Sequence, residues 1–365
     1  MSGKEWRVDA HVHLWELGEA EQLTRIAAAV GCERMGIACI PERAIVNANP
    51  AAWVAKAAYP NRFYVFGGLD HSAFWSGGRV TTPPLAEQVD LLRSIGCDGI
   101  KMLENKPATR KQLDIPVDSD YFAAYFARVE ETGVPLVWHV ADPEEFWDLK
   151  LAPKWAAARG WVYDETYVKK EQLYAEVERV LARHPRLKVS FAHFFFLSAD
   201  LPRASGLLDR FPGVCLDLAP GIELLYNMSK NVPASRAFFI KYAERIVYGT
   251  DIFSRHTLEE ARTRAGIVTR WLETDEEYRV PPGADFLLGP PEDGVMRGLH
   301  LPAEVTAKIC RGNFERLVGK APSPLDRQLA RRESERLARA VETLTGEKAA
   351  SNHAGKAAAR LAHAS

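Results

Sequence analysis

Two histidines near the start of the chain have the residue type and the spacing of a metal-binding pair. His11 and His13 lie in a short apolar run, Val8–Leu14. In a β-strand the side chains alternate between two faces, so both imidazoles would project from the same side. Neutral imidazole is the commonest metal ligand in proteins, and two such rings can bind one divalent cation. A His-x-His pair also occurs on ordinary surfaces and in cores, so the motif alone leaves both interpretations open.

Later apolar runs contain or end in further residues that bind metals, transfer protons or hold anions. They are Lys101, His139, His193 and Asp251. Taken singly, each histidine is more easily explained as a hydrogen-bonded core residue, and Asp251 as the N-cap of a following helix. A common function requires a fold that brings these residues to one place.

The order of apolar and helical segments predicts such a fold. Apolar runs bounded by turn residues alternate with stretches of helical period, which is typical of βα units around a parallel sheet. The predicted strands are Arg7–Leu14, Arg34–Ile40, Phe63–Leu69, Gly99–Leu103, Pro135–Val140, Lys188–His193, Val214–Leu218 and Arg245–Asp251. The predicted helices are Ala20–Val30, Pro50–Tyr59, Ala86–Ile95, Tyr121–Thr132, Lys170–His184, Leu201–Arg210 and Ser235–Ala243. We therefore expect the α/β class and a (β/α)8 TIM barrel, whose functional residues gather at the C-terminal ends of the strands.

The end of the chain departs from this pattern. The barrel is expected to occupy residues 1–319. Leu325–Leu344 has helical period and many charged residues, so residues 320–345 are expected to form a C-terminal helix packed on the barrel or on a partner subunit. Residues 346–365 are rich in Ala, Lys and His without apolar periodicity, so they are expected to be a disordered tail.

Composition narrows the class of function. The 365 residues are 47% hydrophobic and 26% charged, which suits a globular protein with a large core. The formal net charge of -1 gives no reason to expect nucleic acid or an anionic membrane as a partner, so we expect a small-molecule substrate. A homo-oligomer is compatible with this composition. Scattered cysteines and the lack of a signal or transmembrane segment favour a cytoplasmic location.

Taken together, these residues resemble the metal-dependent amidohydrolase superfamily. The resemblance rests on the His11-x-His13 strand, on the single histidines that end the fifth and sixth strands, and on the Gly-Thr-Asp sequence at 249–251, and it extends to about Gly319. It is nearest to the amidohydrolase-related branch. That branch includes aminocarboxymuconate-semialdehyde decarboxylase and related aromatic-acid decarboxylases, alongside lactone and amide hydrolases.

The resemblance implies a metal site with defined roles. The implied ligands of a divalent cation are His11, His13, His139 and Asp251. One Zn2+ is the first choice, with Mn2+ or another divalent ion as alternatives. His193 would be a further metal-site histidine or a group that polarises the substrate. Asp251 would also accept a proton from metal-activated water and deliver it to a leaving group.

The branch contains two reactions, and both stay open. The first is metal-dependent hydrolysis of an amide, lactone or ester bond in a small carboxylate-bearing substrate. The second is non-oxidative decarboxylation of an aromatic or unsaturated acid. A non-enzymatic binding protein comes third, since fold alone does not fix function, but none of the expected ligand positions is lost.

Lys101 has two interpretations under this resemblance. In binuclear members of the superfamily a lysine on the fourth strand is carboxylated and bridges two metals, whereas one metal is usual in the branch resembled here. A lysine at a barrel mouth can equally hold a substrate carboxylate. We expect the anion-holding role for Lys101.

The loops after the strands suggest how a substrate is held. The segment Asp142–Lys169 is long for a βα connection and rich in aromatic residues, so it forms either a lid over a planar ligand or a cluster packed on the barrel rim. Arg255 follows the eighth strand and Tyr226 the seventh, and both are expected to bind substrate. Phe194–Phe196 stands where related proteins commonly have small residues, which predicts a narrowed pocket.

Overall fold

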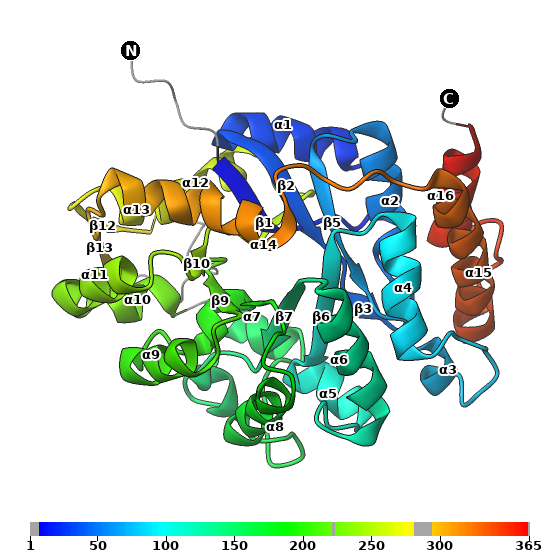
Figure 1. Ribbon diagram of the computed structural model, residues 1–365, viewed down its shortest axis with the longest axis horizontal. Helices are drawn as coiled ribbons and strands as arrows, with labels where there is room; N and C mark the ends of the chain where they lie inside the picture. Colours follow the sequence, from blue (N-terminus) through cyan, green and yellow to red (C-terminus); the bar gives the residue numbers. More distant parts are fainter. Residues whose placement is uncertain (1–6, 221–222, 281–293, 364–365) are drawn as a thin grey trace.

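The centre of the molecule is a curved sheet of parallel strands with helices on its outer side (Figure 1). The computed structural model describes residues 7–220, 223–280 and 294–363. In those residues the main sheet has the order β10-β9-β8-β7-β6-β5-β2-β1-β11. The strands are β1 (Arg7–His13), β2 (Cys32–Ala38), β5 (Phe63–Gly68), β6 (Gly99–Asn105), β7 (Leu136–Val140), β8 (Val189–Phe191), β9 (Val214–Asp217), β10 (Ile246–Val247) and β11 (Ile252–Phe253). Each predicted strand is found, and the predicted (β/α)8 barrel is confirmed.

The predicted eighth strand, 245–251, is split in two. β10 pairs with β9 while β11 pairs with β1, so the two pieces stand at opposite ends of the sheet order. The chain between them bonds to β1, since Ala10 N donates to Tyr248 O at 3.0 Å and Asp251 N donates to His11 O at 2.9 Å. These bonds close the barrel at its first strand. Asp251 has φ 53°, a left-handed conformation that ordinary strand geometry does not allow.

The helices cover the outer face of the sheet. The longer ones are α1 (Ala20–Val30), α2 (Asn49–Ala58), α4 (Leu85–Ile95), α6 (Asp120–Thr132), α8 (Lys170–Arg183), α9 (Leu201–Arg210), α11 (Val232–Lys241) and α12 (Leu258–Glu273). Shorter ones are α3 (Ser72–Trp75), α5 (Pro107–Leu113), η1 (Glu144–Trp147), α7 (Lys154–Ala158), η2 (Ala192–Phe196), α10 (Leu224–Ser229), α13 (Ala303–Ala307), η5 (Lys308–Gly312) and α14 (Asn313–Val318). Two small antiparallel ribbons were not predicted: β3 (Pro41–Glu42) with β4 (Val46–Asn47), and β12 (Glu277–Arg279) with β13 (Val295–Arg297). No helix in the described ranges is long and apolar enough to cross a bilayer.

Two apolar clusters hold the barrel together. The larger one lies between the strands and the helices. The smaller one draws side chains from strands on opposite sides of the sheet, so it fills the barrel interior. Phe314 of α14 belongs to this inner cluster and meets the rings of Tyr64 and Phe66 edge-on, with centroids 5.0 and 6.1 Å away. The interior is therefore packed beneath the functional end of the strands.

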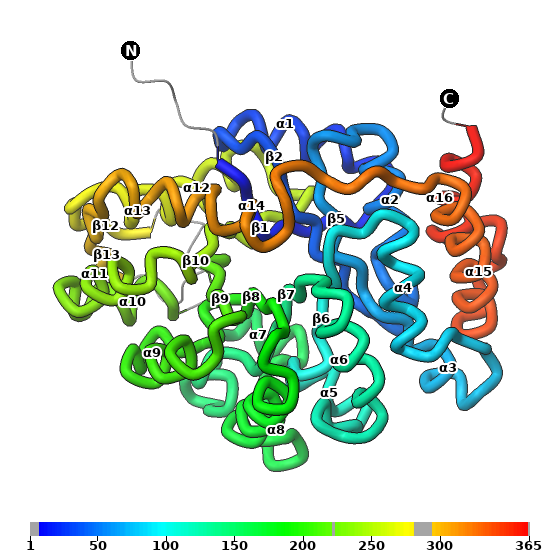
Figure 2. The backbone as a smooth tube through the Cα atoms, in the orientation of Figure 1, coloured from blue at the N-terminus to red at the C-terminus, as the bar shows by residue number. Residues whose placement is uncertain are grey.

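The C-terminal segment forms a helical hairpin, α15 (Arg327–Thr345) and α16 (His353–His363), beside α2 and α4 (Figure 2). The expected helix is found, but the prediction of a disordered tail at 346–365 is wrong for residues up to His363. The reason is a stripe of three alanines and one leucine with helical period, all of them buried: Ala354, Ala357, Ala358 and Leu361. These positions have the i, i+3, i+4, i+7 spacing of an amphipathic helix, a periodicity that the prediction of a disordered tail missed, and the helix packs against α15 and α2. Residues 364 and 365 lie outside the described ranges.

Candidate metal centre and substrate cavity

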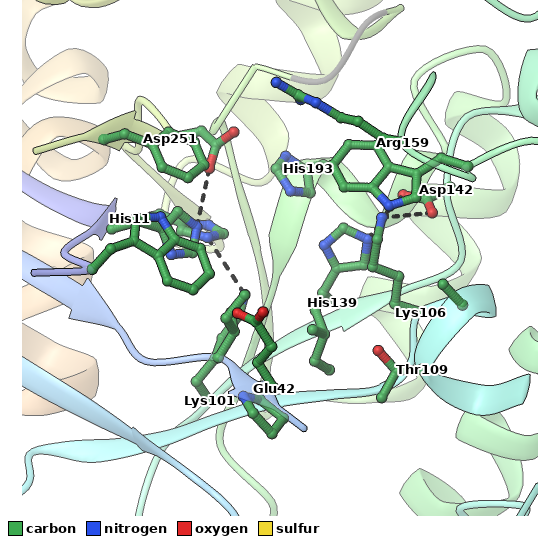
Figure 3. Close-up of a pocket in the computed structure, with 18 of the residues that line it drawn as sticks. His11, Glu42, Lys101, Lys106, Thr109, His139, Asp142, Arg159, His193 and Asp251 are labelled. Atoms are coloured by element: carbon green, nitrogen blue, oxygen red, sulfur yellow. Dashed lines mark hydrogen bonds and ion pairs between the residues drawn. The ribbon is translucent and has the colours of Figure 1, made fainter. Parts of the chain in front are cut away.

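The polar residues predicted at the strand ends line one cavity of about 1110 Å³ (Figure 3). They are His11, His13, Lys101, His139, His193 and Asp251. These residues come from β1, β6, β7, the turn after β8 and the turn before β11. The barrel topology thus brings together residues up to 240 positions apart, as the sequence predicted.

His11, His13 and Asp251 form the tightest group of potential metal ligands. One potential ligand atom from each residue lies within 4.8 Å of those of the other two. Among the described residues, this is the only group of three or more His, Cys, Asp or Glu side chains that meets this distance. His13 Nε2 lies 3.2 Å from Asp251 Oδ1. The rings of His11 and His13 are 5.1 Å apart, so both imidazoles face the same point.

Hydrogen bonds orient both imidazoles toward that point. His13 Nδ1 lies 2.9 Å from the carbonyl oxygen of Ala38, which can only accept, so Nδ1 carries the proton and Nε2 is left to face Asp251. His11 Nδ1 lies 2.8 Å from Asp217 Oδ2, which leaves its Nε2 toward the cavity. A lone pair on His13 Nε2 and a carboxylate oxygen 3.2 Å away repel unless a proton or a cation lies between them. This donor set fits a divalent cation with N and O ligands.

The electrostatics favour the ligand forms of these residues. Burial, together with the nearby Lys101, lowers the pKa of His11 well below its usual value, so this imidazole is neutral. Burial works to raise the pKa of Asp251, but its contact with His13 and the positive charge that the neighbouring histidines can carry hold this pKa below the usual range. A neutral imidazole and an ionised carboxylate are the forms that bind metals.

The backbone around Asp251 is fixed by several contacts. Thr250 donates to Asp9 through its hydroxyl at 2.5 Å and through its backbone N–H at 3.2 Å. Arg264 of α12 donates to the Asp251 carbonyl at 3.0 Å. Asp251 is not a helix cap, because α12 begins later and is capped by Thr257. The interpretation of Asp251 as an N-cap is therefore wrong.

Asp217 was not predicted, and it supports two site histidines at once. Its Oδ2 lies 2.8 Å from His11 Nδ1, and its Oδ1 accepts from His193 N at 2.8 Å and from Ala219 N at 3.1 Å. Burial raises the pKa of Asp217 to about 6. The available signal was an acidic residue inside the apolar run 214–218.

His139 and His193 lie next to the metal-binding group rather than within it. Their rings are 4.9 Å apart, and the His193 ring is 5.4 Å from that of His11. His193 Nδ1 lies 3.0 Å from the Ala219 carbonyl, and His139 Nε2 lies 2.9 Å from the Ala141 carbonyl. Each ring therefore keeps one nitrogen for a ligand: Nε2 in His193 and Nδ1 in His139. Three of the four ligands implied by resemblance come together, and His139 stays a prediction.

A sequence profile of the amidohydrolase family matches residues 8–320 of the chain. The chain belongs to the amidohydrolase family. The resemblance seen in the sequence is thus confirmed at the level of the superfamily.

Several solved structures are similar to this amidohydrolase at low sequence identity. One is 2,6-dihydroxybenzoate decarboxylase complexed with 2,6-dihydroxybenzoate, with 15% identity, a TM-score of 0.51, and coverage of 86% of this chain and 98% of that chain. Another is 5-carboxyvanillate decarboxylase from Novosphingobium aromaticivorans with bound manganese and 3-methoxy-4-hydroxy-5-nitrobenzoic acid, with 12% identity, a TM-score of 0.50, and coverage of 87% and 98%. A probable 2-pyrone-4,6-dicarboxylic acid hydrolase from Acinetobacter baumannii shows 13% identity, a TM-score of 0.47, and coverage of 86% and 99%. No curated protein matches the sequence.

The cavity of this amidohydrolase carries more basic than acidic side chains. The basic ones are Arg43, Lys101, Lys106, Arg159, Arg255 and Arg264. The acidic ones are Glu42, Asp142 and Asp251. Since field lines concentrate in clefts lined by one sign of charge, this excess favours an anionic ligand.

The basic groups differ in how far they are already neutralised. Lys106 Nζ lies 2.7 Å from both oxygens of Asp142, which also accepts from Tyr163. The guanidinium of Arg159 lies over the rings of Trp155 and Trp161, 5.4 and 5.3 Å from their centroids. A cation held by aromatic rings keeps its charge for a ligand. Arg159 was not among the predicted site residues, although it lies in the aromatic segment Asp142–Lys169.

Lys101 lies deep in the cavity, close to the metal-binding group. Its Nζ is 3.4 Å from His11 Nε2, and the side chain is buried. Burial lowers the pKa of Lys101 to about 8. This position suits either of the roles considered for it, because Nζ adjoins both the metal-binding group and the open cavity.

The two loop residues predicted to bind substrate have different surroundings. Arg255 lines the cavity at its rim but is engaged by Glu16 at 2.6 Å and by Glu19 at 3.2 Å. Tyr226, on α10, does not contribute to the described wall of the cavity; its ring lies against Gly294 instead. The structure therefore places Arg255 at the cavity and Tyr226 away from it.

The aromatic segment 142–169 contributes to the cavity wall and forms an aromatic cluster of its own, and its role as a lid over a planar ligand stays a prediction. Phe146, Trp155 and Trp161 line the cavity, while Tyr163 packs against Phe146 and Trp147 in a small cluster of its own. The segment therefore forms one wall of the cavity and is held by its own aromatic contacts.

The three phenylalanines after β8 narrow the cavity less than expected. His193 and all three phenylalanines have positive φ, between 50° and 56°. This turn directs Phe194 toward Phe239 and Phe195 toward Phe191 in the apolar layer, and of the three only Phe196 lines the cavity.

Asp217→Asn is expected to lower metal affinity by roughly 10–100-fold, the usual cost of losing an outer partner of a metal-binding histidine. Asparagine keeps the shape but removes the charge that orients His11. Competition titration against a chromogenic chelator measures this. Asp209→Asn, on the surface of α9, is the matched control. An unchanged affinity in Asp217→Asn would contradict the orienting role.

Proposed function

We propose that this amidohydrolase is a metal-dependent hydrolase that cleaves an amide, lactone or ester bond of a small carboxylate-bearing substrate. The observation that carries the proposal is the group His11, His13 and Asp251, which faces a cavity with an excess of basic side chains. The group supplies a site for a catalytic cation, and the basic side chains supply partners for the substrate carboxylate.

The proposed metal site uses His11, His13 and Asp251, with His139 as a fourth ligand through Nδ1. One Zn2+ is the first choice, because imidazole and carboxylate with an open position suit this ion, and Mn2+ or another divalent ion is the alternative. When bound, the cation would polarise the bond under attack and lower the pKa of a water molecule.

Side chains of the cavity carry out proton transfer and substrate binding. Asp251 accepts a proton from the attacking water, whose oxygen bonds to the carbonyl carbon. The same proton passes to the nitrogen or oxygen of the leaving group as its bond to that carbon breaks. His193 lies beside the reacting centre with Nε2 toward the ligand. Lys101 and the other basic side chains hold the carboxylate of the substrate.

Non-oxidative decarboxylation is the second candidate, favoured by the aromatic walls of the cavity. Rings line it on several sides: Trp15, Phe146, Trp155, Trp161, Phe196 and Phe253. Such walls suit a planar aromatic acid. In that reaction Asp251 would take a proton from a hydroxyl group of the substrate or from water and pass it to the ring carbon, as the bond from that carbon to the carboxylate breaks and CO2 leaves.

A screen that follows hydrolysis and CO2 release separately distinguishes the two candidates. Protein loaded with Zn2+ or Mn2+ is offered lactones, amides, esters and hydroxybenzoates. We expect hydrolysis without CO2 release, lost after chelation and restored by metal. Release of CO2 would favour the second candidate, and activity that persists in fully metal-free protein would contradict both.

Lys101→Ala is expected to leave metal content unchanged and to raise KM for an anionic substrate by roughly tenfold or more, the range of a lost charge-assisted hydrogen bond. Elemental analysis and steady-state kinetics measure the two quantities. Lys111→Ala, on the surface at α5, is the control. Two metals per chain, or a carboxylated Lys101 side chain, would instead indicate the bridging role.

A further inference from the structure

The wall of the main cavity includes residues from beyond the family match. The match ends at residue 320, whereas Leu344 and Thr345, in the last turn of α15, line the cavity. The barrel alone therefore does not complete the site of this chain. The hairpin of α15 and α16 supplies part of it.

The hairpin is anchored firmly enough to act as a wall. Arg336 pairs with the buried Asp70, which follows β5, at 2.6 Å. Arg360 of α16 donates to the carbonyl of Leu17, in the loop after β1, at 2.6 Å. Asn352 ties the two helices together by donating to the Ala338 carbonyl at 2.8 Å. These contacts fix the hairpin to the loops that follow two strands of the barrel.

A second cavity lies between the hairpin and the loop after β1. It has a volume of about 710 Å³, and its walls include Glu347, His353 and Lys356. Trp15, Glu42 and Arg255 line both cavities, so the two spaces adjoin. The main cavity, whose wall includes both the metal-binding group and Leu344 and Thr345 of the hairpin, thus adjoins a polar vestibule beside the hairpin.

The size of the main cavity bears on the substrate. Pockets for drug-sized ligands typically measure about 300–1,000 Å³. At about 1110 Å³ this cavity exceeds that range even without the vestibule. An acid with a single ring, held at the metal-binding group, would leave the space beside the hairpin empty.

We infer that the C-terminal hairpin is a specificity element, and that Leu344 and Thr345 contact the part of the substrate farthest from the metal-binding group. The substrate class is then a carboxylic acid that extends beyond a single ring. This inference rests on the proposed function, because it takes the metal-binding group and the adjacent Lys101 as the place where the acid end of the substrate is held.

Cysteine protection tests the inference without requiring turnover. Thr345→Cys and Thr343→Cys place a thiol at two exposed positions of α15, of which only Thr345 lines the cavity. The native cysteines are all buried, so iodoacetamide will label the introduced thiol. The probes are 2-hydroxybenzoate and 4-phenyl-2-hydroxybenzoate, which share one metal-chelating end and differ in length. Their binding to the metal-loaded variants is measured first by calorimetry.

The longer probe, at about ten times its Kd, should slow the labelling of Thr345→Cys about tenfold, because mass action leaves that fraction of sites free. The shorter probe should leave the rate unchanged, and neither should protect Thr343→Cys. Binding of both probes with no protection at Thr345→Cys would overturn the inference and leave the proposed function intact. If neither probe binds, the acid-binding site itself is contradicted, and the inference with it.

A filling variant provides a second measurement. Thr345→Trp should raise the Kd of the longer probe by roughly tenfold or more, since overfilling a packed site is costly, and should leave the Kd of the shorter probe unchanged. Thr343→Trp is the matched control, and metal content should stay the same in both. Equal losses for the two probes in Thr345→Trp would contradict a role confined to the far end of the substrate.

Discussion

His13→Ala should purify with far less than one bound metal per chain and with turnover reduced in proportion to the metal lost. The variant removes one of three ligand atoms that lie within 4.8 Å of one another. It should therefore cost more than the roughly 10–100-fold in affinity that follows loss of an outer partner. Replacement of His13 tests the metal site more specifically than replacement of His11, because His11 also contacts Lys101 and Asp217.

The His13→Ala experiment compares metal content by elemental analysis, before and after dialysis against chelator, with activity. His363→Ala, exposed in the last turn of α16, is the control for a histidine lost elsewhere. Full metal occupancy in His13→Ala would show that the cation lies elsewhere, and the assignment of the metal centre would fail.

The positions of the strand-end residues could be predicted because they depend on periodicity and topology alone. A residue that ends an apolar run in a parallel barrel lies at the mouth, whatever its distance along the chain. His139 and Asp251 follow this rule and line the cavity, whereas His11 and Lys101 lie inside their strands and line it from there.

Asp217 could not be assigned in the same way, because its role depends on a partner across the barrel. It lies inside an apolar run, where the sequence shows an acidic residue but not its neighbour. Its partner His11 is 206 positions away. The pairing of β9 with β8 and β10, and the inward direction of the side chain, decide the contact.

Backbone conformation is a second property that the sequence pattern does not show. The sequence shows the bulk of Phe194–Phe196 but not the left-handed turn that contains them. Such a conformation costs roughly 1–2 kcal/mol per residue for ordinary L-residues. Burial of Phe194 and Phe195 in the apolar layer offsets this cost and leaves a single ring at the cavity.

Asp251→Asn should lower turnover by about 100-fold or more while metal stays bound, in line with the usual contribution of general acid-base catalysis. Asparagine has the same shape and keeps one oxygen toward the cation, but it cannot accept the proton of the attacking water. The backbone contacts of Asp251 with His11 and Arg264 do not involve the side-chain charge and should persist.

The measurement of Asp251→Asn pairs kcat with metal content in the same samples, so that loss of the proton acceptor is distinguished from loss of the ion. Asp275→Asn, an exposed carboxylate, is the matched control. A fall in kcat at full metal occupancy assigns proton transfer to Asp251. Near-normal kcat at full occupancy would make this carboxylate a ligand only, and the proton acceptor would then have to be sought among the other cavity residues, with His193 first because its Nε2 is the nitrogen left to face a ligand.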